Sequence, residues 1–316
     1  MFDNPIFSFD DTISANLAAL SEIQLRDEER RICELSALAD SAVSVAFSEE
    51  LDGMDIYGRL AFISDAFMPS SATLHAEALE ENVKRLSAFG ELICASDKVF
   101  LSHLLVEKLG KRGYPLSESD FLFSSHIGGR IVYVKNGYSD EAFDVFSAEI
   151  SNARVGYVES LRDAVREVLD DRAQYCLLPL EERGARIASV EELLFSNELR
   201  IAALTPVFGY DGAADMKYAL VSKHFRIPKM SKGDEKYIEI MLPSDGEPPL
   251  GELLLATSML GHSLYRVKGA SFKTADGMRD YYTAVFRESG DFCALLVYLT
   301  LFAPTASIMG IYKNLE

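Results

Sequence analysis

The sequence predicts an α/β and α+β multidomain chain with three parts: an all-helical N-terminal unit, a single α/β lobe and a compact βαββαβ unit. Three observations predict this fold class. Apolar residues at helical spacing fill the first third of the chain, strand and helix patterns alternate in the middle, and the last part follows the order strand, helix, strand, strand, helix, strand. We expect domains at 1–125, 126–228 and 236–316.

The first unit shows helical periodicity over residues 12–110. Its apolar residues recur mostly three and four positions apart, with charged residues between them. The stretch "MPSS" (68–71) interrupts the pattern and offers a serine cap, and a later helical region ends at Gly110 or Gly113. We therefore expect about three helices. The apolar positions that carry this pattern are Ile13, Leu17, Leu20, Ile23, Ile32, Leu35, Leu38, Val43 and Val45.

The middle part alternates between β-branched runs and amphipathic helices, which is typical of a parallel or mixed sheet. We expect Ser139 to cap the first helix, and Pro179 to end the third strand. The expected strands are "GRIVYVKN" (129–136), "ARVGYV" (153–158), "AQYCLLPL" (173–180), "LRIAALTPVF" (199–208) and "KYALVSK" (217–223), and the expected helices are "YSDEAFDVFSAEI" (138–150), "SLRDAVREVLDD" (160–171) and "SVEELLFSN" (189–197).

The last part follows a polar linker, 226–235. It reads as strand "YIEIML", helix "LGELLLATSML" stopped by Gly261, a hairpin of "SLYRVKGASF" and "DYYTAVFRE", helix "DFCALLVYLTLF" and strand "ASIMGIYKN". This order is the split ferredoxin-like arrangement.

Composition limits the classes of partner. The chain of 316 residues is 48% hydrophobic, enough to bury a core, and its formal net charge is −18. That charge argues against nucleic acids and anionic membranes, which are themselves polyanions. The acidic start "MFDNPIFSFDD" lacks the basic region of a signal peptide, and the apolar run 293–303 is too short to span a membrane. We expect a soluble, cytoplasmic protein.

Metal and cofactor motifs are absent from the sequence. No CxxC, HxxxH, HxH or G-x-S-x-G pattern occurs, and the glycines of "SSHIGGR" (124–130) precede a strand rather than follow one. We expect neither a metal nor a cofactor, and we expect the widely spaced cysteines to be buried free thiols in a reducing compartment. These cysteines are Cys33, Cys94, Cys176 and Cys293.

Several motifs in order resemble the prephenate dehydratase family, with its C-terminal ACT domain. "RIVYVKNGYSDEAF" is similar to the family's first strand and turn, V-A-Y-x-G-x-x-G-x-Y-S-H-x-A. "VREVLDDRAQYCLLPLEERGARI" resembles the strand that ends P-I-E-N-S, "DMKYALVSK" resembles the closing T-R-F strand, and "TASIMGIYKNL" looks like the last ACT strand. The resemblance covers about residues 128–316.

The resemblance implies an enzyme of phenylalanine biosynthesis that converts prephenate to phenylpyruvate. The family threonine that serves as proton donor falls on Met216, which has no exchangeable proton. The family arginine falls on Lys217, which keeps the positive charge but lacks the planar guanidinium that binds a carboxylate through two hydrogen bonds. The family aromatic residue falls on Tyr218. The resemblance therefore implies Lys217 and Tyr218 as catalytic residues. It implies Ser139, Glu181 and Arg183 as substrate-binding residues.

The chain also departs from the family in length. The family's second lobe, with its S-H-P-x-A-L-x-Q-C and S-T-A-x-A-A runs, is missing, and the sequence passes directly from the first lobe's last helix to the closing strands. Without that lobe we expect no closed cleft. We therefore expect impaired or lost catalysis.

The ACT-like part departs from the family motifs for binding phenylalanine. Of G-A-L only Leu250 matches, and E-S-R-P is replaced by residues 268–271. Gly269 and Ala270 still leave room for a ligand or a partner backbone. The resemblance implies Leu250, Gly269 and Ala270 as ligand-binding residues and a homodimer through this unit. The alternative function is thus a non-catalytic sensor of a small anionic metabolite or an aromatic amino acid, or a scaffold for a partner enzyme.

A second alternative concerns the helical unit, which has the position and length of the chorismate mutase domain found in some family members. Mutase sites need several inward-facing cations. Solvated helix charges are the competing interpretation. The candidate cations are Arg26, Arg30, Arg31, Arg59, Lys84 and Arg85.

Overall fold

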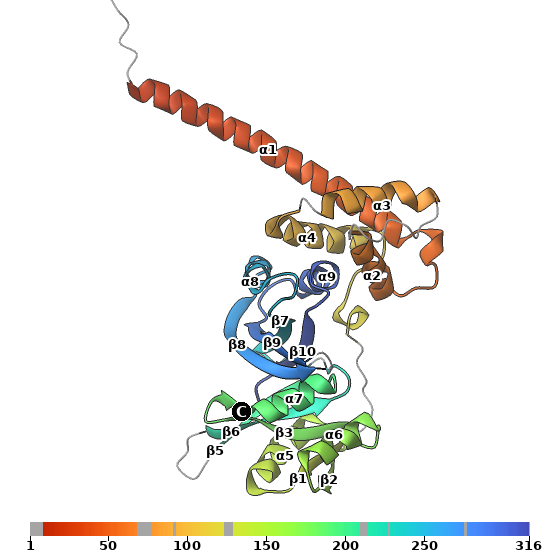
Figure 1. The fold of residues 1–316 in the computed structure, drawn as a ribbon, viewed down its shortest axis with the longest axis vertical. Coiled ribbons are helices and arrows are strands. Elements are labelled where there is room, and N and C mark those ends of the chain that lie inside the picture. The colour runs from red at the N-terminus through yellow and green to blue at the C-terminus, as the bar shows by residue number, and fades with distance from the viewer. Residues whose placement is uncertain are drawn as a thin grey trace, which may run out of the picture.

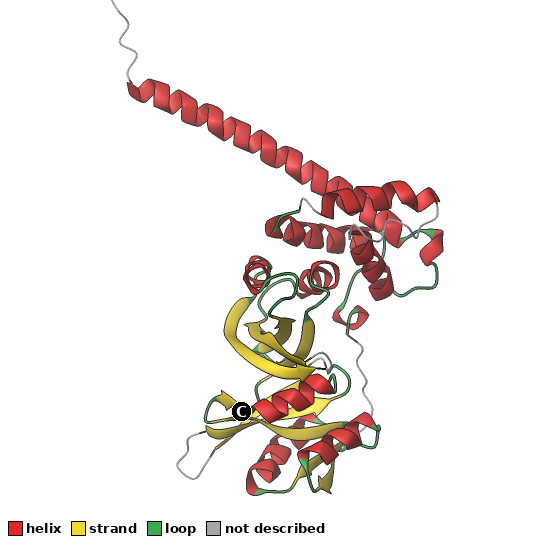
Figure 2. Cartoon of the chain, viewed as in Figure 1, coloured by secondary structure: helices red, strands yellow, loops and turns green. Residues whose placement is uncertain are grey.

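The computed structural model contains a helical part and one large mixed sheet with helices on its faces (Figures 1 and 2). Its ten strands form a single sheet in the order β2-β1-β3-β6-β5-β10-β7-β9-β8, with β4 paired to β3. The structure describes residues 9–67, 77–90, 93–122, 129–208, 214–226, 228–274 and 277–315.

The helical part contains four α-helices among the described residues, so the expectation of about three is wrong. The region before Gly110 is divided into two helices. Helix α3 ends at Gly90, and α4 starts after Cys94, where Asp97 completes a capping box. The expected break at 68–71 lies outside the described residues. The helices are α1 (Phe9–Ala46), α2 (Ile56–Phe67), α3 (Glu77–Gly90) and α4 (Ala95–Lys111), with 3-10 turns η1 (Glu49–Leu51) and η3 (Glu118–Asp120).

Helix α1 is much longer than the core that it enters. Figure 1 shows its N-terminal half extending away from the other elements. Leu20, Leu25 and Ile32 are 46–58% exposed, and burial begins near Leu35. Despite its length, neither this helix nor any other described one is long and apolar enough to cross a membrane.

The α/β lobe follows the predicted alternation of strands and helices. Strands β1, β2 and β3 are parallel, whereas β6 pairs antiparallel with both β3 and β5. Only residues 209–213 separate β5 from β6, which leaves no room for a second lobe at this point. The elements are β1 (Arg130–Val134), α5 (Gly137–Glu149), β2 (Arg154–Val158), α6 (Leu161–Leu169), β3 (Tyr175–Glu182), β4 (Ala185–Arg186), α7 (Ala188–Ser196), β5 (Arg200–Phe208) and β6 (Ala214–Ser222).

The C-terminal unit has the predicted βαββαβ order. Its strands lie in the order β10-β7-β9-β8 and all pair antiparallel, which is the split arrangement expected from the sequence. Helices α8 and α9 cover one face of these strands (Figure 1). The elements are β7 (Lys236–Pro243), α8 (Leu250–Met259), β8 (Ser263–Thr274), β9 (Gly277–Arg287), α9 (Phe292–Phe302) and β10 (Ser307–Lys313).

The expected end of β3 at Pro179 is wrong, because the strand continues to Glu182. Its pairing with β1 covers only Tyr175 and Cys176, so the proline lies beyond that ladder, and the register with β6 shifts between Pro179 and Glu181. A missing N–H is tolerated at such a bulge. The shift places Glu181 opposite Lys217.

The strands of the lobe and the strands of the βαββαβ unit join into one sheet where β10 lies parallel to β5. Gly310 is opposite Ile201, and a Cβ at position 310 would lie 2.6 Å from the Ile201 carbonyl oxygen. Below this point the Leu315 N–H donates to the Leu204 carbonyl at 2.7 Å, and Thr205 Oγ1 donates to the Leu315 carbonyl at 3.0 Å. The close approach of the two backbones requires glycine in the "MGIY" stretch.

The helical part packs on α8 and α9 rather than on the α/β lobe (Figure 1). Val297 and Leu301 of α9 belong to the core of the helical part, and Lys98 of α4 forms an ion pair of 2.6 Å with Glu252 of α8. The helices therefore cover the outer face of the βαββαβ unit.

We predict that Gly310→Ala destabilises the chain. The added methyl group must push β10 away from Ile201, at a cost of about 1–3 kcal/mol. The matched control is Gly251→Ala in α8, where a Cβ meets nothing within 4 Å and helix propensity favours alanine. Urea unfolding of both variants and the wild type checks this. Equal midpoints for the two variants would contradict the role given to Gly310.

Candidate functional site

The order in which strands join the sheet reverses at β1, because β2 lies on one side of it and β3 on the other. Such a reversal leaves a crevice at the carboxyl ends of the strands. Helix α5 leads from β1 to β2 on one side, and α6 returns the chain to β3 on the other side. Ligands of open α/β sheets bind at such a switch point. A cavity of about 330 Å³ lies there, which we call the strand-end pocket. It is lined by Val134, Asn136, Glu159, Ser160, Leu161, Leu177, Pro179 and Tyr218.

Two helix N-termini border the strand-end pocket. The Asn136 side chain accepts a hydrogen bond from the Ser139 N–H at 2.9 Å and caps α5, and Ser160 Oγ accepts one from the Asp163 N–H at 3.1 Å and caps α6. Helix N-termini favour negative charge. Among the described residues no lysine or arginine lines the pocket, and the lining residue Glu159 is exposed. The pocket thus suits a neutral molecule or one carboxylate better than a dianion.

Tyr218 and Met216 lie on the α5 side of the sheet. Tyr218 is buried within the cluster that contains Phe146 of α5, and Met216 packs against the same cluster. Burial raises the pKa of the Tyr218 phenol, and a hydrogen bond with Asn136 acts in the opposite direction. Tyr218 therefore presents a protonated phenol in the strand-end pocket at neutral pH.

Lys217 points to the opposite side of the sheet, because successive residues of a strand alternate between faces. Its charged neighbours are Glu181, Arg186, Arg266 and Glu239. Burial lowers its pKa, the two arginines add to that effect, and the two glutamates oppose it. The structure does not bring Lys217 and Tyr218 together in one site.

A buried network of charged groups, which we call the hinge network, surrounds Lys217. Arg186 Nε lies 3.0 Å from Glu181 Oε1, and Arg186 Nη2 lies 2.8 Å from Glu239 Oε2. These three side chains are 3–7% exposed. Arg266 of β8 also pairs with Glu181 at 2.5 Å, and the Tyr312 hydroxyl donates to Glu239 at 2.8 Å. The network ties the lobe to β7, β8 and β10.

The pKa shifts within the hinge network follow from its pairing. Burial tends to raise the pKa of Glu181, but the hydrogen bond from Arg266 and the charge of Arg186 bring it below its usual value. Burial tends to lower the pKa of Arg186, whereas Glu239 and the other acidic partners raise it above its usual value. Both groups are therefore charged near neutral pH, and they hold each other in place.

Ser139 is not the helix cap that we expected. Asn136 is the N-cap, and Ser139 occupies the third helical position of a capping box. Its hydroxyl accepts from the Asn136 N–H at 2.9 Å and donates to the Val134 carbonyl at 2.8 Å. The serine is 1% exposed, so it shapes the pocket wall from behind.

The three predicted substrate-binding residues lie in three separate places. Ser139 is buried behind the strand-end pocket, and Glu181 is held in the hinge network on the other face. Arg183 is exposed in the turn between β3 and β4, with φ of 50°. Their role in binding a substrate stays a prediction.

The predicted ligand residues of the C-terminal unit are also separated. Leu250 is the first residue of α8 and packs on the helix-covered face of the strands. Ala270 packs against the core on the opposite face, and Gly269 is exposed in β8 beside it. A ligand contacting both groups would have to reach round the edge of β8.

The candidate mutase cations do not gather around one cavity in the described part of the helical unit. Arg26 and Arg30 are about 70% exposed and pair along α1, Arg31 pairs with Asp97, and Arg59 donates to the Ala46 and Met54 carbonyls. This placement favours the interpretation as solvated or capping charges.

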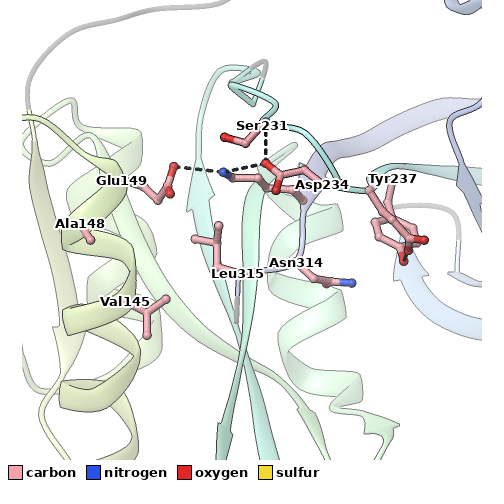
Figure 3. A pocket seen from close by; sticks show the side chains of 11 residues that line it. Val145, Ala148, Glu149, Ser231, Asp234, Tyr237, Asn314 and Leu315 are labelled. Carbon is pink, nitrogen blue, oxygen red and sulfur yellow. Dashed lines mark hydrogen bonds and ion pairs between the residues drawn. The ribbon is translucent and has the colours of Figure 1, made fainter.

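A further cavity, of about 850 Å³, lies between α5, β7 and β10 (Figure 3). Lys313 lies 3.3 Å from both Glu149 and Asp234, so it bridges the two carboxylates. Asp234 also accepts from the Ser231 N–H at 2.9 Å. The charged groups Glu149, Lys313 and Asp234 pair with one another. We therefore interpret this cavity as a packing contact between α5, β7 and β10 rather than as a ligand site.

Among the described residues no group of three or more potential ligands could hold a metal ion. The expected burial of the cysteines is confirmed for Cys176 and is wrong for Cys33 and Cys94, which are exposed, whereas Cys293 is partly buried. Burial raises the pKa of the Cys176 thiol to about 12. Of the two exposed cysteines, Cys33 lies on α1 and Cys94 immediately precedes α4.

No family model and no curated protein matches the chain. Among solved structures it is similar to the prephenate dehydratase from Streptococcus mutans, with 16% identity, a TM-score of 0.46, and coverage of 60% of this chain and 100% of that one. It is also similar to the prephenate dehydratase from Arthrobacter aurescens in complex with L-Phe, with 14% identity, a TM-score of 0.42, and coverage of 58% and 89%. A third similar structure is GqqA, described as a novel type of quorum quenching acylase, with 16% identity, a TM-score of 0.41, and coverage of 58% and 94%.

Sequence reasoning missed the residues that build the pocket and the network. Asn136 and Ser160 each stand three positions before a residue whose N–H they accept, a local signal that capping rules recognise. Glu239 and Arg266 left no such signal, because each is an isolated charge in a strand pattern. Glu239 pairs with Arg186, and Arg266 pairs with Glu181. Each pair joins segments that lie more than 50 residues apart in the sequence.

We predict that Arg186→Met lowers the free energy of unfolding by about 3–5 kcal/mol, because it leaves Glu181 and Glu239 buried with fewer partners. The matched control is Arg279→Met, which breaks an exposed pair with Asp245 and should cost less than about 1 kcal/mol. Urea unfolding measures both. Equal losses would contradict the structural weight given to the hinge network.

Proposed function

We propose that this protein is a relative of the prephenate dehydratases whose dehydratase step is impaired or lost, and that it binds a small carboxylate in the strand-end pocket. The observation that carries the proposal is the division of the "MKY" stretch between two faces of the sheet. Tyr218 lines the pocket, while Lys217 faces the hinge network. Kinship is supported by the order of motifs over residues 128–316.

Loss of catalysis is supported by the chemistry of the pocket. Removing the ring hydroxyl of prephenate needs a proton donor, and Met216 has none to offer at the matching position. Prephenate is a dianion, and no cationic side chain of the described part of the chain lines the pocket. With only residues 209–213 between β5 and β6, no inserted lobe closes over the ligand.

Binding is supported by the two capped helix N-termini and the buried phenol. A single carboxylate at the N-termini of α5 and α6 gains from both helix dipoles, and Tyr218 and Asn136 supply polar contacts. Calorimetry with phenylalanine, tyrosine and phenylpyruvate tests this. We expect Asn136→Ala to weaken any binding at this pocket.

We predict no dehydratase turnover by the wild type or by Met216→Thr. The threonine restores a hydroxyl but neither a cation nor a second lobe. Purified protein is incubated with prephenate and separately with chorismate, and product absorbance is followed. A kcat of about 1 s⁻¹ or more for prephenate, an ordinary enzyme value, would overturn the proposal. Turnover of chorismate would instead place a mutase activity in the helical part.

A homodimer through the βαββαβ unit, the ACT-like sensor alternative, has its own support. Strand β8 forms one edge of the sheet and presents Leu264, Tyr265 and Val267, which are 37–53% exposed. Leu255 and Met259 of neighbouring α8 are also exposed, at 51% and 46%. The exposed apolar side chains of this edge strand, which also carries Arg266, Lys268 and Lys273, suit it to pairing with a second copy.

We predict that Val267→Lys converts a dimer into a monomer, because a charge on this edge opposes pairing. The control is Val155→Lys on β2, the opposite edge of the sheet, where Val155 is 43% exposed. Sedimentation velocity over a range of concentrations reads the oligomeric state. A wild type that stays monomeric, or a dimer that only the control disrupts, would rule out pairing through β8.

A further inference from the structure

A cavity of about 380 Å³, which we call the junction cavity, lies where the helical part, the α/β lobe and the βαββαβ unit meet. Tyr57 of α2 and Phe121 after η3 contribute from the first part, Arg200 and Phe225 from the lobe, and Thr300 and Ile308 from the last. Its volume falls within the range of small-molecule sites, about 300–1,000 Å³. It shares no lining residue with the strand-end pocket.

The cationic group that lines this cavity is Arg200, at the start of β5. It is partly buried, yet among the described residues no carboxylate lies within 4 Å of its guanidinium and no acceptor is in hydrogen-bond reach. Arg186 of the same lobe, whose side chain is only 3% exposed, has two carboxylate partners. Burial lowers the pKa of Arg200, and the charge of Glu198 only partly opposes this effect. A desolvated cation without an anion is costly, unless an anion from solution completes it.

The rest of the cavity is aromatic and aliphatic. The Arg200 guanidinium lies 5.1 Å from the centre of the Phe225 ring, which holds it over an aromatic face. The rings of Tyr57 and Phe121 meet edge to face at 6.5 Å, and Tyr57 is 47% exposed. Leu296 and Leu299 of α9 line the floor. Such walls accept a flat apolar group next to the cation.

We propose that the junction cavity binds a small monocarboxylate that carries an aromatic ring. The carboxylate pairs with the Arg200 guanidinium through charge-assisted hydrogen bonds, and the ring packs among Tyr57, Phe121 and Phe225. A second negative charge on the ligand is disfavoured, because Asp65 is exposed at the cavity and Glu198 lies near Arg200. The ligand contacts all three parts of the chain at once.

The test uses 3-phenylpropionate as the probe and 3-phenylpropanamide as its uncharged match, with titration calorimetry on the full chain. We expect the wild type to bind the acid, and Arg200→Gln to bind it about tenfold or more weakly, since a hydrogen bond to a charged group contributes at least that factor. We expect Arg200→Lys to fall between them. The amide should bind the wild type as weakly as the acid binds Arg200→Gln.

Two control variants locate the site. Arg172→Gln removes an exposed arginine that pairs with Asp170 and Glu167, and should leave binding unchanged. Tyr218→Phe alters the strand-end pocket, where the proposed function places a separate carboxylate site, so any binding that it removes should be distinct from the binding that Arg200→Gln removes. Absence of binding by the wild type, equal binding of acid and amide, or unchanged binding by Arg200→Gln would each overturn the proposal. Loss of the Arg200-dependent binding in Tyr218→Phe would move the ligand to the strand-end pocket and overturn it as well.

Discussion

The close pairing of β10 with β5 holds the architecture together. A glycine at position 310 lets the last strand of the chain approach Ile201, and the Leu315 N–H completes the contact with Leu204. This pairing merges the strands of the lobe and of the βαββαβ unit into one ten-stranded sheet. The C-terminal unit is therefore a continuation of the lobe rather than a module on a tether.

The hinge network depends on that merger. Arg186 belongs to the lobe, whereas Glu239 belongs to β7, and the two meet at 2.8 Å because the sheets are continuous. Helix α7 adds a second contact between the lobe and the βαββαβ unit, because Phe195 stacks on Phe272 of β8 with ring centres 5.2 Å apart. A buried ion network fixes a particular arrangement more than it adds stability, because its charges must first be desolvated. Lys217 lies among these charges, and this placement separates it from the pocket that its sequence motif suggests.

The helical part contacts the βαββαβ unit rather than the lobe. It packs on α8 and α9, at the other end of the molecule from β1, α5 and α6 (Figure 1). Its helix α2 and the segment after η3 line one side of the junction cavity, where Arg200 has no carboxylate partner among the described residues. The two pockets thus differ in kind: one lies at the N-termini of two helices, and the other offers a guanidinium between aromatic walls.

The sequence by itself determined the elements. Its periodicity predicts the strands and helices of the lobe and of the βαββαβ unit, because side-chain burial repeats every two residues in a strand and every 3.6 in a helix. Capping signals at Asn136 and Ser160 were also readable, since they act over three residues. Only the tertiary structure decided that Lys217 lies within the hinge network, that Pro179 lies within a strand, and that Arg200 has no carboxylate partner among the described residues. These facts depend on register, on a bulge and on contacts between distant segments, none of which leaves a local pattern in the sequence.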